Sequence, residues 1–476
     1  MKCKLDKLEI PADQPFKNCK LDREKYAEIL KTIITTYEKG FVLAINGRWG
    51  TGKTTFVEMW KAYLELDNFH TLYFNAWEND FISDPLVGLL GELKKINPQE
   101  KAKAALTSAI NTAGKIVLKA APAMFKGVVK KYAGEDIVNI FYDGIEEGAS
   151  MLKKEIENYE SQKYSLKQFR EELEKYVDEI CDKKPLIFII DELDRCNPHY
   201  AVKTLERIKH LFNIPNIVFI LSIDKEQLSN SIRGYYGSNL IAADEYLKRF
   251  IDIEYILPDP DVDSFCKYLF DYYDFKSAFF YTQNQITYHA SNATDDLLMT
   301  ATAIFRYKKL TLRQVEKIFT NIRLSLNMFS NRHNLYTNLV FLLTYLRICE
   351  PDCYEKLSHK EYKTQELIKQ IETLFPQQMF DTKFNNRNRY FYFTIALLLD
   401  CYRTTNLLGR NEDERFLVKL EGKNRLFFTV NIINESLLIE ALEWHESKQD
   451  IVPLETITTK INLLENLTIS FAGSEK

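Results

Sequence analysis

Residues 47 to 54 combine three closely spaced glycines with a lysine and a threonine, a pattern that can bind phosphate. They read Gly-Arg-Trp-Gly-Thr-Gly-Lys-Thr and match the spacing GxxxxGK[ST] between an apolar run and a helical pattern. The glycines let the backbone curl and aim its N–H groups inward, at a helix start whose dipole favours an anion. Lys53 would reach the β and γ phosphates, and the Thr54 hydroxyl would hold Mg²⁺. The predicted nucleotide-binding residues are Gly47, Arg48, Trp49, Gly50, Thr51, Gly52, Lys53, Thr54 and Thr55.

An acid pair, Asp191 and Glu192, follows the apolar run 186 to 190. Ligands of open α/β sheets bind at the carboxyl ends of the strands, where these carboxylates would emerge. Asp191 there would hold Mg²⁺ together with Thr54, and Glu192 would orient and deprotonate a water that attacks the γ phosphate. Two adjacent acids at this place can also cap the next helix, but the phosphate-binding loop upstream favours the catalytic interpretation.

Short apolar runs alternate with helical patterns over the first 260 residues, which is typical of a three-layer α/β fold around a parallel sheet. Each run is apolar without alternation, as in a strand that is covered on both faces. The predicted strands are 41–46, 71–75, 185–190, 216–223 and 250–257. A helical insertion separates the second from the third, and its last helix is expected from Ser165, as a cap, to Asp182.

Bulk composition agrees with a globular protein of several domains. The chain has 476 residues, a net charge of −4 and eight cysteines without a CxxC pair. This argues against a zinc ribbon, a disulfide framework and a global basic field for nucleic acid or anionic lipid. Lysines interrupt the longest apolar stretch, 104–129, so we expect no membrane span and a cytoplasmic protein.

The expected domain organisation follows the same signals. It comprises a lead-in (1–37), the first part of the nucleotide-binding core (38–84), a helical insertion (85–180), the second part of the core (181–260), a lid-like helical region (261–356) and a mostly helical domain without an assigned role (357–476). The insertion carries a stripe of lysines: Lys115, Lys119, Lys126 and Lys130, around Pro122. The helix can pack on its own domain, or it can dock on a partner protein, a membrane or nucleic acid.

The segment around the acid pair resembles the hallmark of the KAP family of P-loop NTPases. It reads Phe188-Ile-Ile-Asp191-Glu-Leu-Asp194-Arg195-Cys-Asn-Pro198. Five further segments fit the same family, and the resemblance covers roughly residues 38 to 356. They are Phe74-Asn-Ala-Trp77-Glu, Val218-Phe-Ile-Leu-Ser-Ile-Asp224, Tyr246-Leu-Lys-Arg249-Phe, Leu310-Thr-Leu-Arg313-Gln-Val-Glu and Ile348-Cys-Glu-Pro351-Asp-Cys-Tyr354.

The resemblance implies an ATPase of the ASCE type that uses ATP and Mg²⁺. It implies a polar sensor of the γ phosphate at Asp224, with Ser222 as the alternative. Arg249 and Arg313 become candidates for the cation that neutralises transition-state charge, within one subunit or from a neighbour. Asp194 and Arg195 either form a structural pair or act in the chemistry. The catalytic candidates are thus Glu192, Lys53, Asp224, Arg249 and Arg313.

Three functional hypotheses follow. The first is an ATP-hydrolysing switch or motor that forms a homo-oligomer and acts on a second effector protein; the resemblance associates this class with bacterial defence against phage and plasmids. The second is an ATP-dependent oligomeric scaffold with little hydrolysis. The third is a nucleic-acid translocase, against which the acidic composition counts.

Overall fold

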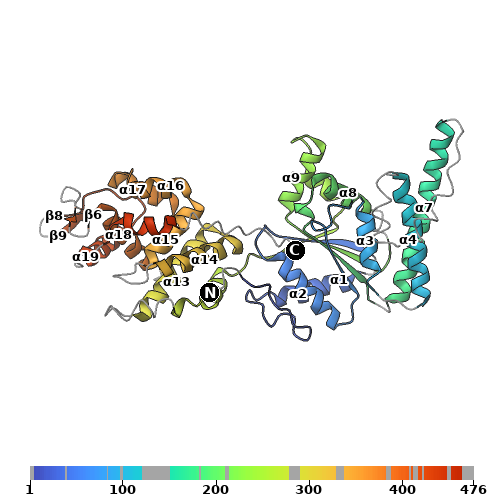
Figure 1. Ribbon diagram of the computed structural model, residues 1–476, viewed down its shortest axis with the longest axis horizontal. Helices are drawn as coiled ribbons and strands as arrows, with labels where there is room; N and C mark the ends of the chain where they lie inside the picture. The colour runs from blue at the N-terminus through green and yellow to red at the C-terminus, as the bar shows by residue number, and fades with distance from the viewer. Residues whose placement is uncertain are drawn as a thin grey trace. The chain divides into compact units, whose positions relative to one another are not determined.

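The computed structural model describes residues 5–37, 40–82, 84–96, 100–120, 151–181, 184–209, 214–277, 290–328, 337–381, 388–406, 409–410, 416–420, 423–446 and 452–463. The chain forms two compact units (Figure 1). Lys7–Asp259 makes the first, called here the P-loop unit. Met1–Asp6 and Pro260–Lys476 make the second, called the helical unit.

A five-stranded parallel sheet forms the centre of the P-loop unit, as predicted. Its strands are β1 (Phe41–Asn46), β2 (Thr71–Asn75), β3 (Leu186–Asp191), β4 (Ile217–Ile223) and β5 (Ile253–Ile256). Their order is β2-β3-β4-β1-β5, which places β4 between the strand that leads into the glycine-rich loop and the strand that ends in the acid pair. The fifth strand is shorter than expected, because the N–H groups of Arg249 and Phe250 bond within a turn to Tyr246 and Leu247.

Helices cover both faces of this sheet because neighbouring strand residues point in opposite directions. On β1, Val42 and Ala44 join the core beneath α3 (Pro85–Leu93), α8 (Pro198–Lys209) and α9 (Lys225–Tyr236). Leu43 and Ile45 join the core beneath α1 (Glu24–Thr36) and α2 (Lys53–Leu66). A short helix, α10 (Ala243–Leu247), and a 3-10 turn, η1 (Leu193–Arg195), complete the unit. The predicted three-layer α/β fold is therefore confirmed.

Beyond α3, the described part of the predicted insertion (85–180) consists of two long helices, α4 (Glu100–Ala120) and α7 (Met151–Ile180), that lie side by side (Figure 1). The Glu172 carboxylate joins them, since it accepts bonds from the hydroxyls of Ser108 at 2.7 Å and Thr112 at 2.8 Å. The expected start at Ser165 is wrong, because α7 begins at Met151 and continues through that residue. No helix among the described residues is long and apolar enough to cross a membrane.

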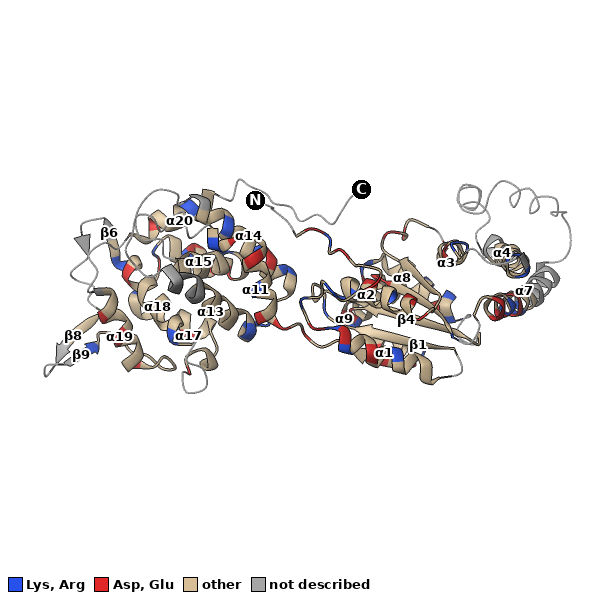
Figure 2. Ribbon diagram, turned by 90° about the horizontal axis from the view of Figure 1, so that it is seen from below, with Lys and Arg blue, Asp and Glu red and all other residues tan. Residues whose placement is uncertain are grey.

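The lysine stripe of the insertion falls largely outside the described residues. Pro122, Lys126 and Lys130 are not described, and neither are the side chains of Lys115 and Lys119. Acidic and basic residues are otherwise interspersed over the helices of both units (Figure 2).

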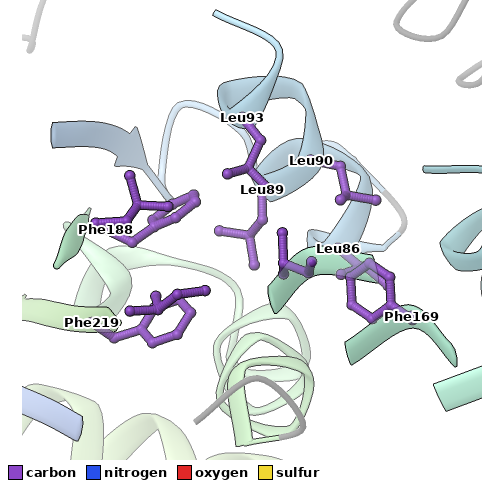
Figure 3. Close-up of a pocket in the computed structure, with 10 residues that line it drawn as sticks. Leu86, Leu89, Leu90, Leu93, Phe169, Phe188 and Phe219 are labelled. Carbon is purple, nitrogen blue, oxygen red and sulfur yellow. The ribbon is translucent and has the colours of Figure 1, made fainter. Parts of the chain in front are cut away.

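An apolar cavity of about 10 Å³ lies between α3, α7 and the sheet (Figure 3). Leucines of α3 and the rings of Phe169, Phe188 and Phe219 line it. Its volume is at the lower limit for one water molecule, and its walls offer no polar partner. It is a packing gap of the core.

The helical unit is built mainly from helices, as predicted. These are α11 (Val262–Tyr272), α13 (Ala290–Lys308), α14 (Leu312–Met328), α15 (Thr337–Cys349), α16 (Pro351–Ser358), α17 (Thr364–Leu374), α18 (Arg389–Arg403), α19 (Glu435–Glu446) and α20 (Leu454–Asn462), with a 3-10 turn η2 (Gln377–Met379). The expectation of an all-helical region is wrong in one respect. Two small antiparallel sheets occur, formed by β6 (Thr404–Asn406) with β7 (Gly409–Arg410) and by β8 (Leu417–Leu420) with β9 (Lys423–Leu426).

Candidate nucleotide-binding site

The glycine-rich loop connects β1 to α2 and has the backbone that its glycines predict. Gly50 and Gly52 have φ values of 74° and 81°, in the left-handed region that other residues rarely adopt. The N–H of Gly47 donates to the carbonyl of Ile223 at 3.1 Å, which ties the start of the loop to the end of β4. The loop therefore begins at the carboxyl edge of the sheet and ends at a helix N-terminus, as a phosphate site requires.

Lys53 is held by the carbonyl oxygens of its own loop. Its ammonium donates to the carbonyls of Gly47 and Arg48, and only 8% of the residue is exposed. Burial lowers the pKa of Lys53, while the nearby carboxylates of Asp194, Asp224 and Asp191 oppose this effect. A cation in this position is available to a phosphate once it exchanges these carbonyls for phosphate oxygens.

Asp191 ends β3, beside Ser222 of β4 in the sheet register. One carboxylate oxygen accepts the Tyr73 hydroxyl at 2.9 Å and the other accepts the N–H of Glu192 at 2.9 Å. Burial and the Asp191 carboxylate raise the pKa of Tyr73, so this phenol stays a donor. The buried Ser222 hydroxyl has no hydrogen-bond partner among the described residues. The floor of the site thus offers a fixed carboxylate and an unsatisfied hydroxyl.

These oxygens suit Mg²⁺. The carboxylate of Asp191 and the hydroxyl of half-buried Thr54, in the first turn of α2, are hard ligands of the kind that this ion prefers. In the described part of the chain, three or more His, Cys, Asp or Glu side chains nowhere gather around a common point. Mg²⁺ needs no such cage, because it keeps several waters and takes its other ligands from substrate phosphates.

Glu192 follows Asp191 and adopts a left-handed conformation with φ of 60°. Both of its carboxylate oxygens are engaged. Oε1 forms an ion pair with Arg195 at 2.5 Å, and Oε2 accepts from the amide of Asn75 at 3.2 Å. Burial raises the pKa of Glu192, and the Arg195 charge acts in the opposite direction. Each contact uses one acceptor site of a carboxylate that has about four, so Glu192 can still accept a hydrogen bond from a water.

Asp194 and Arg195 do not pair with each other among the ion pairs of the described residues. The Asp194 carboxylate instead accepts from the indole N–H of Trp49 in the loop. Arg195 pairs with Glu192, and its guanidinium lies 5.8 Å from the centre of the exposed Trp77 ring. The alternative of a structural Asp194–Arg195 pair is therefore wrong. The two residues instead connect the loop after β3 to two different parts of the site.

Asp224 contacts the loop directly. Its carboxylate accepts the N–H of Trp49 at 3.0 Å and caps α9 through the N–H of Gln227 at 3.4 Å. The predicted sensor position thus lies against the glycine-rich loop, where it couples β4 to the loop backbone.

Of the two arginine candidates, Arg249 does not lie at this edge of the P-loop unit, and Arg313 belongs to the helical unit. Exposed Arg249 precedes β5, where Asp252 bonds to Val42 at the beginning of β1. The full length of β1, about 20 Å for six residues, separates that level from the loop. Exposed Arg313 belongs to α14 of the helical unit. The structure therefore brings together the loop, Asp191, Glu192 and Asp224, but not Arg249.

Arg23 is a residue of the site that sequence reasoning missed. It directly precedes α1, in the stretch assigned to a lead-in, and donates to the carbonyls of Thr51 and Gly52 in the loop. A single arginine among polar residues carries no signal by type or spacing.

Comparison with known proteins agrees with this geometry. The sequence matches the model of the KAP family P-loop domain over residues 23–331, which is more than half of the chain. The chain belongs to this family. The match begins at Arg23 and ends before the segment 348–354, so it does not test the resemblance of that segment.

Two solved structures are similar to the KAP chain at low identity. The ORC2 protein of Aeropyrum pernix, in ADPNP and ADP complexes, is 12% identical with a TM-score of 0.32, and the match covers 89% of this chain and 93% of that one. A DNA replication initiation factor is 14% identical with a TM-score of 0.30, and the match covers 97% and 98%. No curated protein matches the sequence.

Proposed function

We propose that this KAP protein hydrolyses ATP with Mg²⁺ and works as a conformational switch on a partner protein. The observation that carries the proposal is the meeting of the glycine-rich loop, Asp191 and Glu192 at one edge of the sheet. The loop and Lys53 would bind the phosphates, Thr54 and Asp191 would hold Mg²⁺, and Mg²⁺ would neutralise charge on the phosphates. Glu192 would then orient the attacking water and accept its proton.

The test is Mg²⁺-dependent release of phosphate from ATP by the wild-type chain, with the oligomeric state recorded with and without ATP. Turnover that requires Mg²⁺ and exceeds that of Lys53→Ala supports the proposal. Turnover equal to that of Lys53→Ala contradicts hydrolysis at this site.

A second candidate function is an ATP-dependent scaffold with little hydrolysis. The contacts of Glu192 with Arg195 and Asn75 favour it, because both stabilise the ionised carboxylate and so make it a weaker base for hydrolysis. A wild-type chain that assembles on ATP without releasing phosphate, while Lys53→Ala fails to assemble, would support the scaffold. A role in defence against phage or plasmids, beside a second effector protein, rests on the family resemblance alone.

The ionisation of Glu192 gives a pH dependence with a definite sign. A base must be deprotonated, and burial holds the pKa of Glu192 above its ordinary value of 4.5. We therefore expect turnover to fall as the pH decreases through this raised pKa. Arg195→Ala removes a charge that lowers the pKa, so it should move the acidic limb of the kcat profile to higher pH. Arg233→Ala, an arginine of α9 that contacts Asn230, is the control; an unmoved limb in Arg195→Ala would contradict the role of Glu192 as the base.

In a homo-oligomer, exposed Arg249 could reach the nucleotide site of a neighbouring subunit. Because Arg249 lies at the edge opposite its own loop, we propose that it completes the site of a neighbouring subunit. Arg249→Ala should then lower kcat by about 10³-fold. Mixing Arg249→Ala with Glu192→Gln should restore activity, because the second variant supplies an intact arginine to the first. A mixture that forms joint oligomers but stays inactive would contradict action between subunits.

A further inference from the structure

Arg23 contacts the glycine-rich loop on the side that faces away from the expected phosphates. One guanidinium nitrogen donates to the carbonyl of Gly52 at 3.0 Å, and the other donates to the carbonyl of Thr51 at 2.7 Å. The residue is 2% exposed. These are two charge-assisted bonds from one rigid, planar group to two consecutive peptide units.

Because of the geometry of the peptide unit, these bonds also determine the direction of the N–H groups on the phosphate side of the loop. In a trans peptide the C=O and N–H groups point in opposite directions, and the described chain has no cis peptide. Fixing the carbonyls of Thr51 and Gly52 toward Arg23 therefore aims the N–H groups of Gly52 and Lys53 the other way. These are N–H groups of the anion nest at the start of α2.

Among the described residues Arg23 has no carboxylate in direct contact, and Asp259 acts on its charge only at longer range. In the part of the chain that the structure describes, no ion pair involves Arg23, and its hydrogen bonds go to neutral carbonyls. Burial lowers its pKa to about 10, with weaker opposing effects from Cys19, Tyr26 and Asp259, so the group remains charged at neutral pH. A buried cation without a counterion is costly, and an anion bound nearby offsets this cost. A polyphosphate on the other side of the loop is such an anion.

The helix that carries Arg23 is itself fixed to the helix that follows the loop. The indole N–H of Trp60 in α2 donates to the carbonyl of Ala27 in α1 at 3.2 Å. Ala27, Leu30 and Phe56 are fully or almost fully buried in the same core. Arg23 is therefore held in register with the loop by both helices.

We propose that Arg23 is a positioning residue of the nucleotide site, which orients the loop N–H groups and adds positive charge for the polyphosphate of a nucleoside di- or triphosphate. The proposal rests on the nucleotide-binding function proposed above. It goes beyond that function because it makes α1 part of the binding site.

The experiment measures the Kd of Mg-ATP and of ADP by titration calorimetry, together with the melting temperature without nucleotide, for the wild type and three variants. Arg23→Gln removes the charge, Arg23→Lys keeps it but cannot form the two-pronged contact, and Lys25→Gln changes an exposed cation of the same helix as the control. We expect Arg23→Gln to weaken both nucleotides by about 10- to 100-fold, Arg23→Lys to give an intermediate loss, and Lys25→Gln to match the wild type. The nucleotide-induced rise in melting temperature should shrink in the same order.

The outcomes separate this inference from the function on which it rests. A lower melting temperature without nucleotide, combined with unchanged Kd values in Arg23→Gln and Arg23→Lys, would make Arg23 a structural brace and overturn the inference alone. If Arg23→Gln does not fold, wild-type affinity in Arg23→Lys would overturn it equally. A wild-type chain that binds neither nucleotide would overturn the proposed function as well.

Discussion

Glu192→Gln is expected to lower kcat for ATP hydrolysis by a hundredfold or more while Kd for Mg-ATP changes by no more than about threefold. The substitution keeps the size of the side chain, but its amide has one acceptor oxygen, so it keeps only one of the contacts to Arg195 and Asn75. What is lost is the ability to accept a proton from the attacking water. Single-turnover kinetics with Mg-ATP, combined with calorimetric binding, measure the two quantities separately.

Glu78→Gln provides the matched control for this prediction. Glu78 is an exposed glutamate in the turn that follows β2, near Asn75 in sequence. It should turn over ATP like the wild type. Equal losses of kcat in Glu78→Gln and Glu192→Gln would point to a general effect of negative charge at this edge. Full activity of Glu192→Gln would exclude Glu192 as the base.

The core of the site could be predicted because its signals are local. A buried parallel strand is a continuous apolar run, so 41–46 matches β1, and the residue at which a run ends locates the edge where ligands bind. The run 71–75 matches β2, but the expectation that it is covered on both faces is wrong, because β2 is an edge strand whose residues are alternately buried and half-buried. The loop requires positive φ values, which glycine adopts readily, so the roles of Gly50 and Gly52 could be predicted from the sequence. Asp191 and Glu192 follow from the end of β3 together with the phosphate-binding loop upstream.

The rest depends on contacts between distant segments. Arg23 reaches the loop across 28 residues, and Asn75 reaches Glu192 across 117, with no pattern in sequence that links them. The position of Arg249 follows from the pairing of β5 with β1, so a motif could identify the arginine but not the edge of the sheet at which it lies. The short hairpins of the helical unit were missed because strands such as β7, with two residues, have no measurable periodicity.

Lys53→Ala is expected to weaken Mg-ATP binding by about a hundredfold and to abolish any ATP-dependent assembly. The ammonium is the flexible cation of the site, and its removal takes away a charge-assisted contact to the phosphates. It also removes the positive charge that faces Asp194, Asp224 and Asp191, so the remaining acids would repel the polyphosphate. Calorimetry with Mg-ATP and sedimentation with and without ATP measure both effects.

Lys61→Ala is the control for this variant, because Lys61 lies on the same helix and pairs with Glu65 at the surface. It should bind ATP like the wild type. The loss in Lys53→Ala has a second signature: without the ammonium, the carbonyls of Gly47 and Arg48 lose a donor, so the loop itself should become less ordered before any nucleotide arrives. Tryptophan fluorescence of Trp49, which is 42% exposed, should report this change. Wild-type affinity for Mg-ATP in Lys53→Ala would contradict the role of Lys53 as a phosphate-binding residue.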